Sequence, residues 1–152
     1  MRRAPRTLIT AALLGLAATG LTAQPAAAEP PWQQPYGMHC GGIQVERCAW
    51  LDWDPGGRIR AEGNTLDKIG GGNYSVALND VKIQILVPFG GWTSINGTAV
   101  GDYDGWHSTS DSATSRPAGY WCGWQYRALT LHRWTGDSSG GEWIASNPVT
   151  LC

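Results

Sequence analysis

Two carboxylates in one short polar run are the residues whose types and spacing come closest to doing chemistry. Asp102 and Asp104 stand in the run Asp-Tyr-Asp-Gly-Trp-His. Such a pair could share a calcium ion in a loop or serve a glycosidase. An EF-hand loop would need another oxygen ligand where Trp106 stands, and a domain of this size rarely builds a glycosidase cleft. The pattern is most typical of a polar turn whose side chains bond their own backbone.

No other residue stands in the context of a catalytic group. The G-x-S-x-G elbow of serine hydrolases is missing, and His39, His107 and His132 are too dispersed to predict a metal triad. A second acidic pair, Asp52 and Asp54, leads into a Pro-Gly-Gly turn signal that accounts for Asp54 without a function. We therefore expect no catalytic residue, no metal site and no cofactor, and a small hydrolase is the least favoured function.

The sequence contains nine tryptophans, and their places predict two roles. Three of them fall inside strand patterns and are predicted to fill the core: Trp50, Trp124 and Trp134. Four others flank turn residues and are predicted to be more exposed: Trp92, Trp106, Trp121 and Trp143. Exposed rings stack on sugars or anchor protein interfaces. We expect Arg127 and Arg133 to stack on some of the rings as structural cation–π pairs.

Residues 1–28 have the pattern of a cleaved export signal. Arginines open the chain, residues 8–21 are apolar and uncharged, and alanines at 26–28 offer the small residues that signal peptidase requires. The apolar run is short for a membrane span of about 20 residues. We expect a protein secreted as residues 29–152, without a membrane anchor.

The four cysteines, Cys40, Cys48, Cys122 and Cys152, all follow this signal. An even number in an oxidising compartment favours two disulfides over a metal site, and no C-x2-C pair occurs. Three pairings remain open. A Cys122–Cys152 bridge would close a loop of ordinary length, whereas a Cys48–Cys122 bridge would have the separation seen in sandwich domains.

The composition of residues 29–152 restricts the partner and the fold class. Eight Lys and Arg stand against twelve Asp and Glu in this part, so its net charge is −4. A mildly acidic chain with scattered charges argues against nucleic acid and against anionic membranes as partners. Gly, Ser, Thr and Asn are abundant and long helix-forming runs are absent, which predicts an all-β domain with many turns.

Alternating patterns in residues 40–152 predict a compact, disulfide-bonded antiparallel β-sandwich of about seven or eight strands. The expected strands cover residues 44–53, 58–62, 74–78, 81–87, 92–100, 121–134, 142–145 and 149–152. Residues 81–87 are the clearest strand, because aliphatic and other residues alternate along them. Turns are expected at Asn79-Asp80 and, as a hairpin, at Asn96-Gly97, and residues 101–117 are expected to be polar and turn-rich.

Residues 29–39 contain three prolines and no periodicity. We expect them to be extended and poorly paired, because proline lacks an N–H group. They are either a loose terminus or a tether for a partner, with Trp32 and Tyr36 as anchors.

Three runs resemble a group of small secreted proteins of Streptomyces and related actinobacteria. They are Arg-Ile-Arg-Ala-Glu at 58–62, Asp-Tyr-Asp-Gly-Trp-His at 102–107 and Trp-Gln-Tyr-Arg-Ala at 124–128, followed by the terminal cysteine. The resemblance covers most of residues 29–152, and no residue role comes with it. In size and export the chain is also similar, more weakly, to the small adaptor subunits of Streptomyces umbrella toxin particles. Those subunits join a large stalk protein to a lectin-bearing subunit.

We expect a secreted protein that binds rather than catalyses. The leading hypothesis is a protein-interaction module with a secreted protein partner, either an adaptor in an extracellular complex or an inhibitor of a secreted enzyme. The alternative is a stand-alone carbohydrate-binding module, in which tryptophan rings stack on sugars and carboxylates bond their hydroxyl groups. The candidate binding residues are Trp32, Tyr36, Trp92, Asp102, Asp104 and Trp106.

Overall fold

A computed structural model describes residues 32–68 and 73–152, and these form eleven strands. The strands are β1 Gln33–Gly41, β2 Val45–Asp54, β3 Arg58–Asp67, β4 Tyr74–Val87, β5 Gly91–Ser94, β6 Val100–Gly101, β7 Ser110–Thr114, β8 Ala118–Gly119, β9 Gln125–Gly136, β10 Gly140–Ala145 and β11 Val149–Thr150. The predicted export signal at 1–28 lies outside the described residues, as does most of the glycine-rich segment at 69–73. Within the described part, no helix has the length and apolar character of a membrane span.

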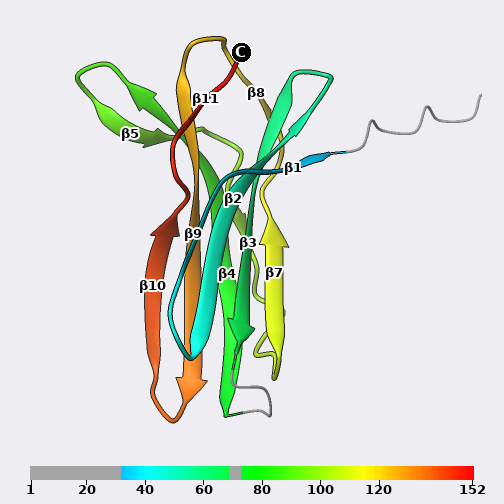
Figure 1. Cartoon of the computed structure of the whole chain (residues 1–152), viewed down its shortest axis with the longest axis vertical. Coiled ribbons are helices and arrows are strands. Elements are labelled where there is room, and N and C mark those ends of the chain that lie inside the picture. Colours follow the sequence, from blue (N-terminus) through cyan, green and yellow to red (C-terminus); the bar gives the residue numbers. More distant parts are fainter. Residues whose placement is uncertain (1–31, 69–72) are drawn as a thin grey trace, which may run out of the picture.

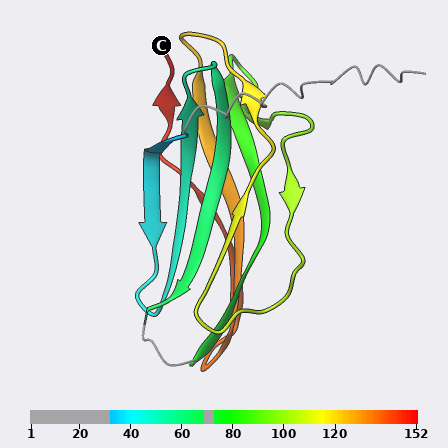
Figure 2. The ribbon, with the colours of Figure 1, turned by 90° about the vertical axis from the view of Figure 1, so that its right-hand side faces the viewer.

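The strands form two antiparallel sheets that pack face to face (Figures 1 and 2), which confirms the predicted all-β sandwich. Sheet A has the order β1-β2-β3-β7, with β8 paired to β3. Sheet B has the order β10-β9-β4-β5, with β11 paired to β9 and β6 paired to β4. The strands outnumber the predicted seven or eight because β1, β7 and β8 come from segments that were expected to be loops or poorly paired.

The core lies between the two sheets and follows the predicted alternation. Val81, Ile83 and Ile85 of β4 are buried, as are Ala49 and Leu51 of β2. These residues belong to one apolar cluster. Side chains two residues apart point to the same face of a strand, so each strand contributes every second residue to this cluster.

The predicted turn at Asn79-Asp80 is wrong, because β4 continues through both residues. The pairing with β9 shifts register between Leu78 and Asp80, which makes Asn79 the extra residue of a β-bulge. Leu78 and Val81 are both fully buried although they are three positions apart. A regular strand would place them on opposite faces, so the bulge keeps both in the core.

The predicted turn at Asn96-Gly97 is present, with the Thr98 N–H donating to the Ile95 carbonyl at 3.3 Å, but the hairpin expected there does not form. Both β5 and β6 pair with β4 instead of with each other. The segment between them bends away from β4 and is tied back by Thr98. The Thr98 hydroxyl accepts the Ile83 N–H at 3.3 Å and donates to the Ile95 carbonyl at 2.8 Å.

The N-terminal segment is better paired than its prolines predicted. Gln33–Gly41 forms β1, an edge strand that is antiparallel to β2 and has two register shifts. Pro35 lies at the first shift, between the paired residues Gln33 and Tyr36. Proline is tolerated on edge strands and at such irregularities because no ladder hydrogen bond is needed there. The expectation of a poorly paired segment is therefore wrong for Gln33–Gly41.

Two disulfides are present, as predicted, and they settle the pairing. Cys40 is bonded to Cys48 and Cys122 to Cys152. The first bridge joins directly opposed residues of β1 and β2, and the sandwich-like Cys48–Cys122 pairing is not formed.

A buried histidine links the two sheets through the core. His132 of β9 is hydrogen-bonded through Nδ1 to Thr65 Oγ1 of β3 at 2.7 Å. Its Nε2 lies 2.6 Å from Thr130 Oγ1. Burial, and to a smaller extent the charge of Arg47, lower the pKa of His132 to about 3, so the ring is neutral at physiological pH.

The chain crosses from sheet B to sheet A within residues 101–117. His107 forms an isolated bridge with Val76 of β4, and Ser110–Thr114 then pairs with β3 as β7. This strand was not predicted, because its two buried positions are Asp111 and the small Ala113 rather than large apolar residues. The crossing brings Asp111 close to the polar run that begins at Asp102.

Candidate functional site

The structure does not gather the six predicted binding residues at one place. Trp32 lies over sheet A, Tyr36 lies in β1 and Trp92 lies in β5. The other three, Asp102, Asp104 and Trp106, lie together in the connection after β6. We call this connection, with its neighbours His107 and Asp111, the loop surface.

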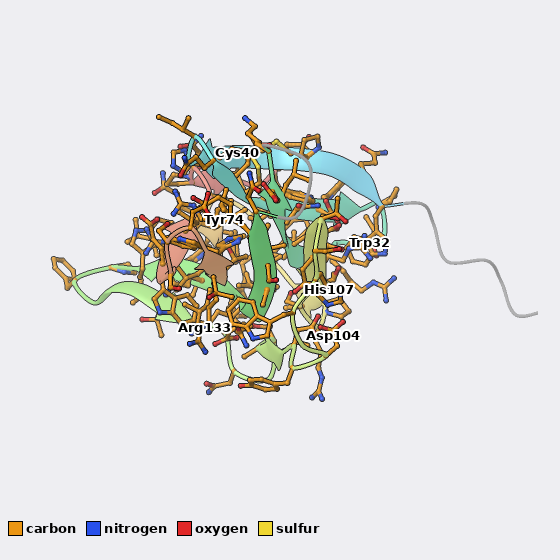
Figure 3. The ribbon with its side chains drawn as sticks, turned by 90° about the horizontal axis from the view of Figure 1, so that it is seen from below. Trp32, Cys40, Tyr74, Asp104, His107 and Arg133 are labelled. Atoms are coloured by element: carbon orange, nitrogen blue, oxygen red, sulfur yellow. A yellow bond between two sulfur atoms is a disulfide. The ribbon has the colours of Figure 1, made fainter. Side chains whose placement is uncertain are left out.

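The acidic pair of the loop surface forms the polar turn that its sequence predicted. The Asp102 carboxylate accepts the backbone N–H of Asp104 at 3.3 Å. His107 Nε2 lies 3.0 Å from Asp104 Oδ1, and Figure 3 shows the two side chains next to each other. The hydrogen bond with Asp104 raises the pKa of His107, and the same bond lowers the pKa of Asp104. Burial raises the pKa of the nearby Asp111.

Trp106 gives the loop surface its aromatic group. Its side chain is half exposed, and the Arg133 guanidinium carbon lies 6.0 Å from the centre of the ring. Trp106, Arg133 and Trp134 line an open pocket of about 400 Å³ together with Gly140 and Gly141. A sugar could lie there between an aromatic ring and hydrogen-bonding groups.

A positive side chain lies over five of the nine tryptophans, at 4.0 to 6.0 Å from the ring centre. The pairs are Arg47–Trp134, Arg60–Trp32, Lys82–Trp143, Arg127–Trp92 and Arg133–Trp106. The predicted stacking of Arg127 and Arg133 is thereby confirmed. A cation over a ring occupies one of the two faces on which a sugar could stack, so these rings are less suited to be sugar platforms.

Two exposed tryptophans differ from this group. In the described part of the chain, no Lys or Arg side chain lies over Trp121 or Trp124, and the two rings lie 6.4 Å apart. Trp121 is 63% exposed and Trp124 is 36% exposed. The prediction that Trp124 fills the core is wrong, because β9 begins only at Gln125 and Trp124 belongs to the preceding turn.

A phenylalanine at the same end of the sandwich has an unfavourable backbone. Phe89 lies in the turn between β4 and β5, where the Gly90 N–H donates to the Val87 carbonyl at 3.2 Å. Its φ of 61° is the left-handed value that Gly or Asn usually takes in a turn after Pro. Its relative exposure is 112%, so burial of the ring does not offset the strain. Such a conformation costs a non-glycine residue about 1 kcal/mol or more.

The phenylalanine turn and the two tryptophans belong to one surface. Figure 1 shows the β4–β5 turn, the β8–β9 connection and the C-terminus at the same end of the sandwich. A pocket of about 280 Å³ joins the two segments, because Leu86 and Pro88 line it on one side and Trp124 on the other. We define the apolar end as Leu86, Pro88, Phe89, Trp121 and Trp124.

The base of the apolar end is held in place by the fold. Cys122 is bonded to Cys152, and the Gly123 N–H donates to the Leu151 carbonyl at 3.0 Å. The buried Tyr126 hydroxyl accepts the Trp121 N–H at 2.8 Å. The tryptophans are therefore presented by a pre-organised turn.

The outer face of sheet A carries a network of charges that could exchange a proton. The Arg60 guanidinium contacts Asp52 at 2.9 Å and Glu62 at 3.4 Å, and it lies 4.4 Å from the Trp32 ring centre. Burial raises the pKa of Glu62 to about 7, and a hydrogen bond to Asp52 adds to this shift. Carboxyl groups with raised pKa values are common in active sites, but here Arg60 pairs with both groups. The arrangement is that of a structural ion-pair network.

None of the five residues of the apolar end was among the six predicted binding residues, although Trp121 was predicted to be exposed and is so. The run Pro-Phe-Gly at 88–90 could have indicated an exposed aromatic residue. It forms a turn directly after the clearest strand, and a phenylalanine in such a turn points away from the core. No protein-family model matches the chain, and no curated protein matches it significantly.

Proposed function

We propose that this chain is a secreted, non-catalytic protein-interaction module that contacts a secreted protein partner through its apolar end. The observation that carries the proposal is Phe89, a fully exposed aromatic side chain on a strained backbone. A glycine would remove the strain without losing a contact in the fold. Strain of this kind persists where function requires it, and a contact with a partner would repay it.

The neighbours of Phe89 support an interface with a protein. Aromatic residues dominate the energetic centres of protein interfaces, because they bury much area at small cost in side-chain entropy. Trp121 and Trp124 supply two such rings beside the phenylalanine turn. Exposed apolar groups gathered at one place mark interaction sites on secreted domains.

The disulfides and the predicted export signal favour a partner that is itself secreted. The two disulfides fit an oxidising compartment, in agreement with the predicted export signal. A rigid sandwich with the exposed Phe89 at its apolar end suits an inhibitor that inserts this side chain into a secreted enzyme. It equally suits an adaptor in an extracellular complex, such as the umbrella toxin adaptors that the sequence weakly resembles.

The test compares the wild-type chain with Phe89→Gly. Both are produced as full-length tagged chains with their own leader and recovered from the culture medium of the producing strain. We expect the wild type to co-purify with one larger secreted protein in stoichiometric amount, and the variant to lose it. We also expect Phe89→Gly to unfold at the same or a higher temperature, because the strain is removed.

Ile43→Ser is the matched control. Ile43 is also an exposed apolar residue, at 92%, but it lies in the β1–β2 turn, at the opposite end of the sandwich (Figure 1). This variant should retain the partner. A Phe89→Gly chain that keeps its partner and loses stability would show that Phe89 has a structural role, and the proposal would fail.

The second candidate is a carbohydrate-binding module at the loop surface. The observation that favours it is the open pocket beside Trp106, whose other walls include Arg133 and Trp134. Trp106→Ala should abolish retention on a glycan array in this case. If the wild-type chain binds no glycan, this candidate is excluded and the proposal above is unaffected.

A further inference from the structure

Three groups that can bind a metal ion converge at the loop surface, although they come from separate parts of the crossing segment. Asp104 lies in the connection, His107 in the bridge to β4, and Asp111 in β7. One ligand atom of each lies within 4.8 Å of the others. Figure 3 shows Asp104 and His107 side by side at this end of the molecule.

The most informative member is Asp111, because its side chain is only 5% exposed. One carboxylate oxygen, Oδ2, accepts the Leu78 N–H at 2.6 Å. The other, Oδ1, points towards His107 Nε2 at 3.8 Å, which is too long for a hydrogen bond. In the described part of the chain, no hydrogen bond reaches this oxygen. Oδ1 is not one of the buried polar atoms that lack a hydrogen bond, so it reaches solvent, and an ion could approach it between Asp111 and His107.

The fold holds all three groups in position. The His107 N–H donates to the Val76 carbonyl at 2.9 Å, and its own carbonyl accepts the Val76 N–H at 2.8 Å. Asp111 lies opposite Thr65 in the pairing of β7 with β3. Asp104 is held through its backbone N–H by the Asp102 carboxylate. The backbones are therefore in place before any ligand arrives.

The separations of the ligand atoms fit a small divalent ion. Zinc binds imidazole nitrogen and carboxylate oxygen at about 2.0–2.2 Å in a tetrahedron, which puts neighbouring ligand atoms roughly 3.3 Å apart. His107 Nε2 lies 3.0 Å from Asp104 Oδ1 and 3.8 Å from Asp111 Oδ1. All three atoms lie within 4.8 Å of one another, so rotation of the exposed Asp104 side chain could bring them around one ion.

We propose that Asp104, His107 and Asp111 bind one divalent transition-metal ion, with zinc as the best match. Calcium prefers oxygen ligands only, whereas imidazole with carboxylates suits zinc and its neighbours in the periodic table. Such an ion would join Asp104 and His107 to Asp111 in β7 and so stabilise the crossing between the sheets. This site is separate from the apolar end and does not depend on the proposed function.

The experiment titrates ZnCl₂ into the full chain by calorimetry, after production in an exporting host and removal of metal with EDTA. We expect saturable binding of one ion per chain and a higher unfolding temperature with zinc. His107→Gln should weaken binding at least about tenfold, since loss of even an outer partner of a metal ligand costs 10–100-fold. Asp111→Asn should do the same, and near-UV circular dichroism checks that each variant is folded.

His39→Gln is the matched control, because His39 is exposed in β1 and belongs to no such group. It should bind zinc like the wild type. Three results would overturn the inference: no saturable binding of zinc, unchanged affinity in a folded His107→Gln chain, or binding of calcium in preference to zinc. Since His107 is partly exposed, its replacement should leave the fold intact even if Asp111→Asn does not.

Discussion

Tryptophans are exposed both on the outer face of sheet B and at the apolar end, but the side chains around the rings differ between the two regions. On the sheet, Lys82 lies 4.0 Å from the centre of the Trp143 ring and Arg127 lies 4.3 Å from that of Trp92. At the apolar end, Trp121 and Trp124 contact each other, and no described cation lies over them. The same residue type therefore lies under a cation in one region and packs against a second ring in the other.

The difference comes from the neighbours that each backbone supplies. On sheet B, the strands place long cationic side chains of β4 and β9 beside rings from β10 and β5. At the apolar end, the rings belong to turns whose other residues are Gly, Pro and Cys, which carry no charge. We expect substitutions on the sheet to affect stability, and substitutions at the apolar end to affect binding.

The largest effect should come from removing a disulfide, because one bridge should affect both stability and partner binding and the other stability alone. Loss of the Cys122–Cys152 bridge, with a sequence separation of 30, should lower the free energy of unfolding by roughly 3.5 kcal/mol. Loss of the Cys40–Cys48 bridge, with a separation of 8, should lower it by roughly 2.5 kcal/mol. Urea unfolding of the two double Cys→Ser variants measures both values.

Only loss of the Cys122–Cys152 bridge should also weaken capture of the partner, because this bridge holds the turn that carries Trp121 and Trp124. Binding is compared at a temperature where both variants are folded. Equal loss of binding in the two variants would mean that the apolar end has no special role.

Trp124→Ala and Trp143→Ala form the most direct comparison, because the two side chains are 36% and 43% exposed. We expect Trp124→Ala to weaken partner binding about 30-fold, the equivalent of about 2 kcal/mol for an interface centre. Trp143→Ala should leave the affinity within about threefold, and should lower stability slightly as Lys82 loses its ring. Surface plasmon resonance with the captured partner measures both affinities, and the reverse order would contradict the assignment.

The charged face of sheet A should affect stability in a pH-dependent way. The pKa of Glu62 is about 7 in the fold and 4.5 in a free chain. The folded state therefore binds the extra proton between these values, and the stabilisation is complete below pH 4.5 and lost as pH rises through 7. Glu62→Gln should remove this dependence, which we expect to be roughly 1–2 kcal/mol after solvent screening.

Unfolding of both proteins between pH 4 and 8 measures the Glu62 contribution. The buried His132 acts in the opposite direction, because its lowered pKa makes the fold less stable as pH falls below 6.5. This contribution is the same in wild type and variant, so their difference isolates Glu62. A difference that does not vary with pH would show that Glu62 titrates normally.

The smallest effect should come from removing one cation. Lys82→Met takes the ammonium group away from Trp143 and from Asp80, which lies 3.3 Å away. An exposed cation–π pair contributes about 0.5–1 kcal/mol. We therefore expect the free energy of unfolding, measured by thermal unfolding, to fall by this amount. Partner capture should not change, and a loss of capture would extend the interface onto sheet B.

Much of the fold could be predicted, because burial imposes a period of two on each strand. The alternation in residues 81–87 and the aromatic and small residues of β9 placed Val81, Ile83, Tyr126 and Ala128 in the core, where they lie. The predictions failed where pairing overrode local signals. Asn79 forms a bulge instead of a turn, and Gln33–Gly41 is paired because β2 offers it a free edge.

The candidate sites were less predictable than the fold. Trp106 with Asp102 and Asp104 forms one loop, as their closeness in sequence requires. Asp111 joins them only because β7 crosses to sheet A. Phe89 and Trp124 are 35 positions apart, and only the packing of the β4–β5 turn against the start of β9 brings their turns to one end.

The sequence by itself determined the fold class and the presence of two disulfides, because composition, periodicity and the number of cysteines carry these properties. The tertiary structure decided the pairing of the cysteines, which tryptophans lie under a cation, and which segments meet at the apolar end and the loop surface. These properties depend on contacts between residues far apart in the chain. Such contacts are selected by strand register and sheet packing, which no local pattern of residues specifies.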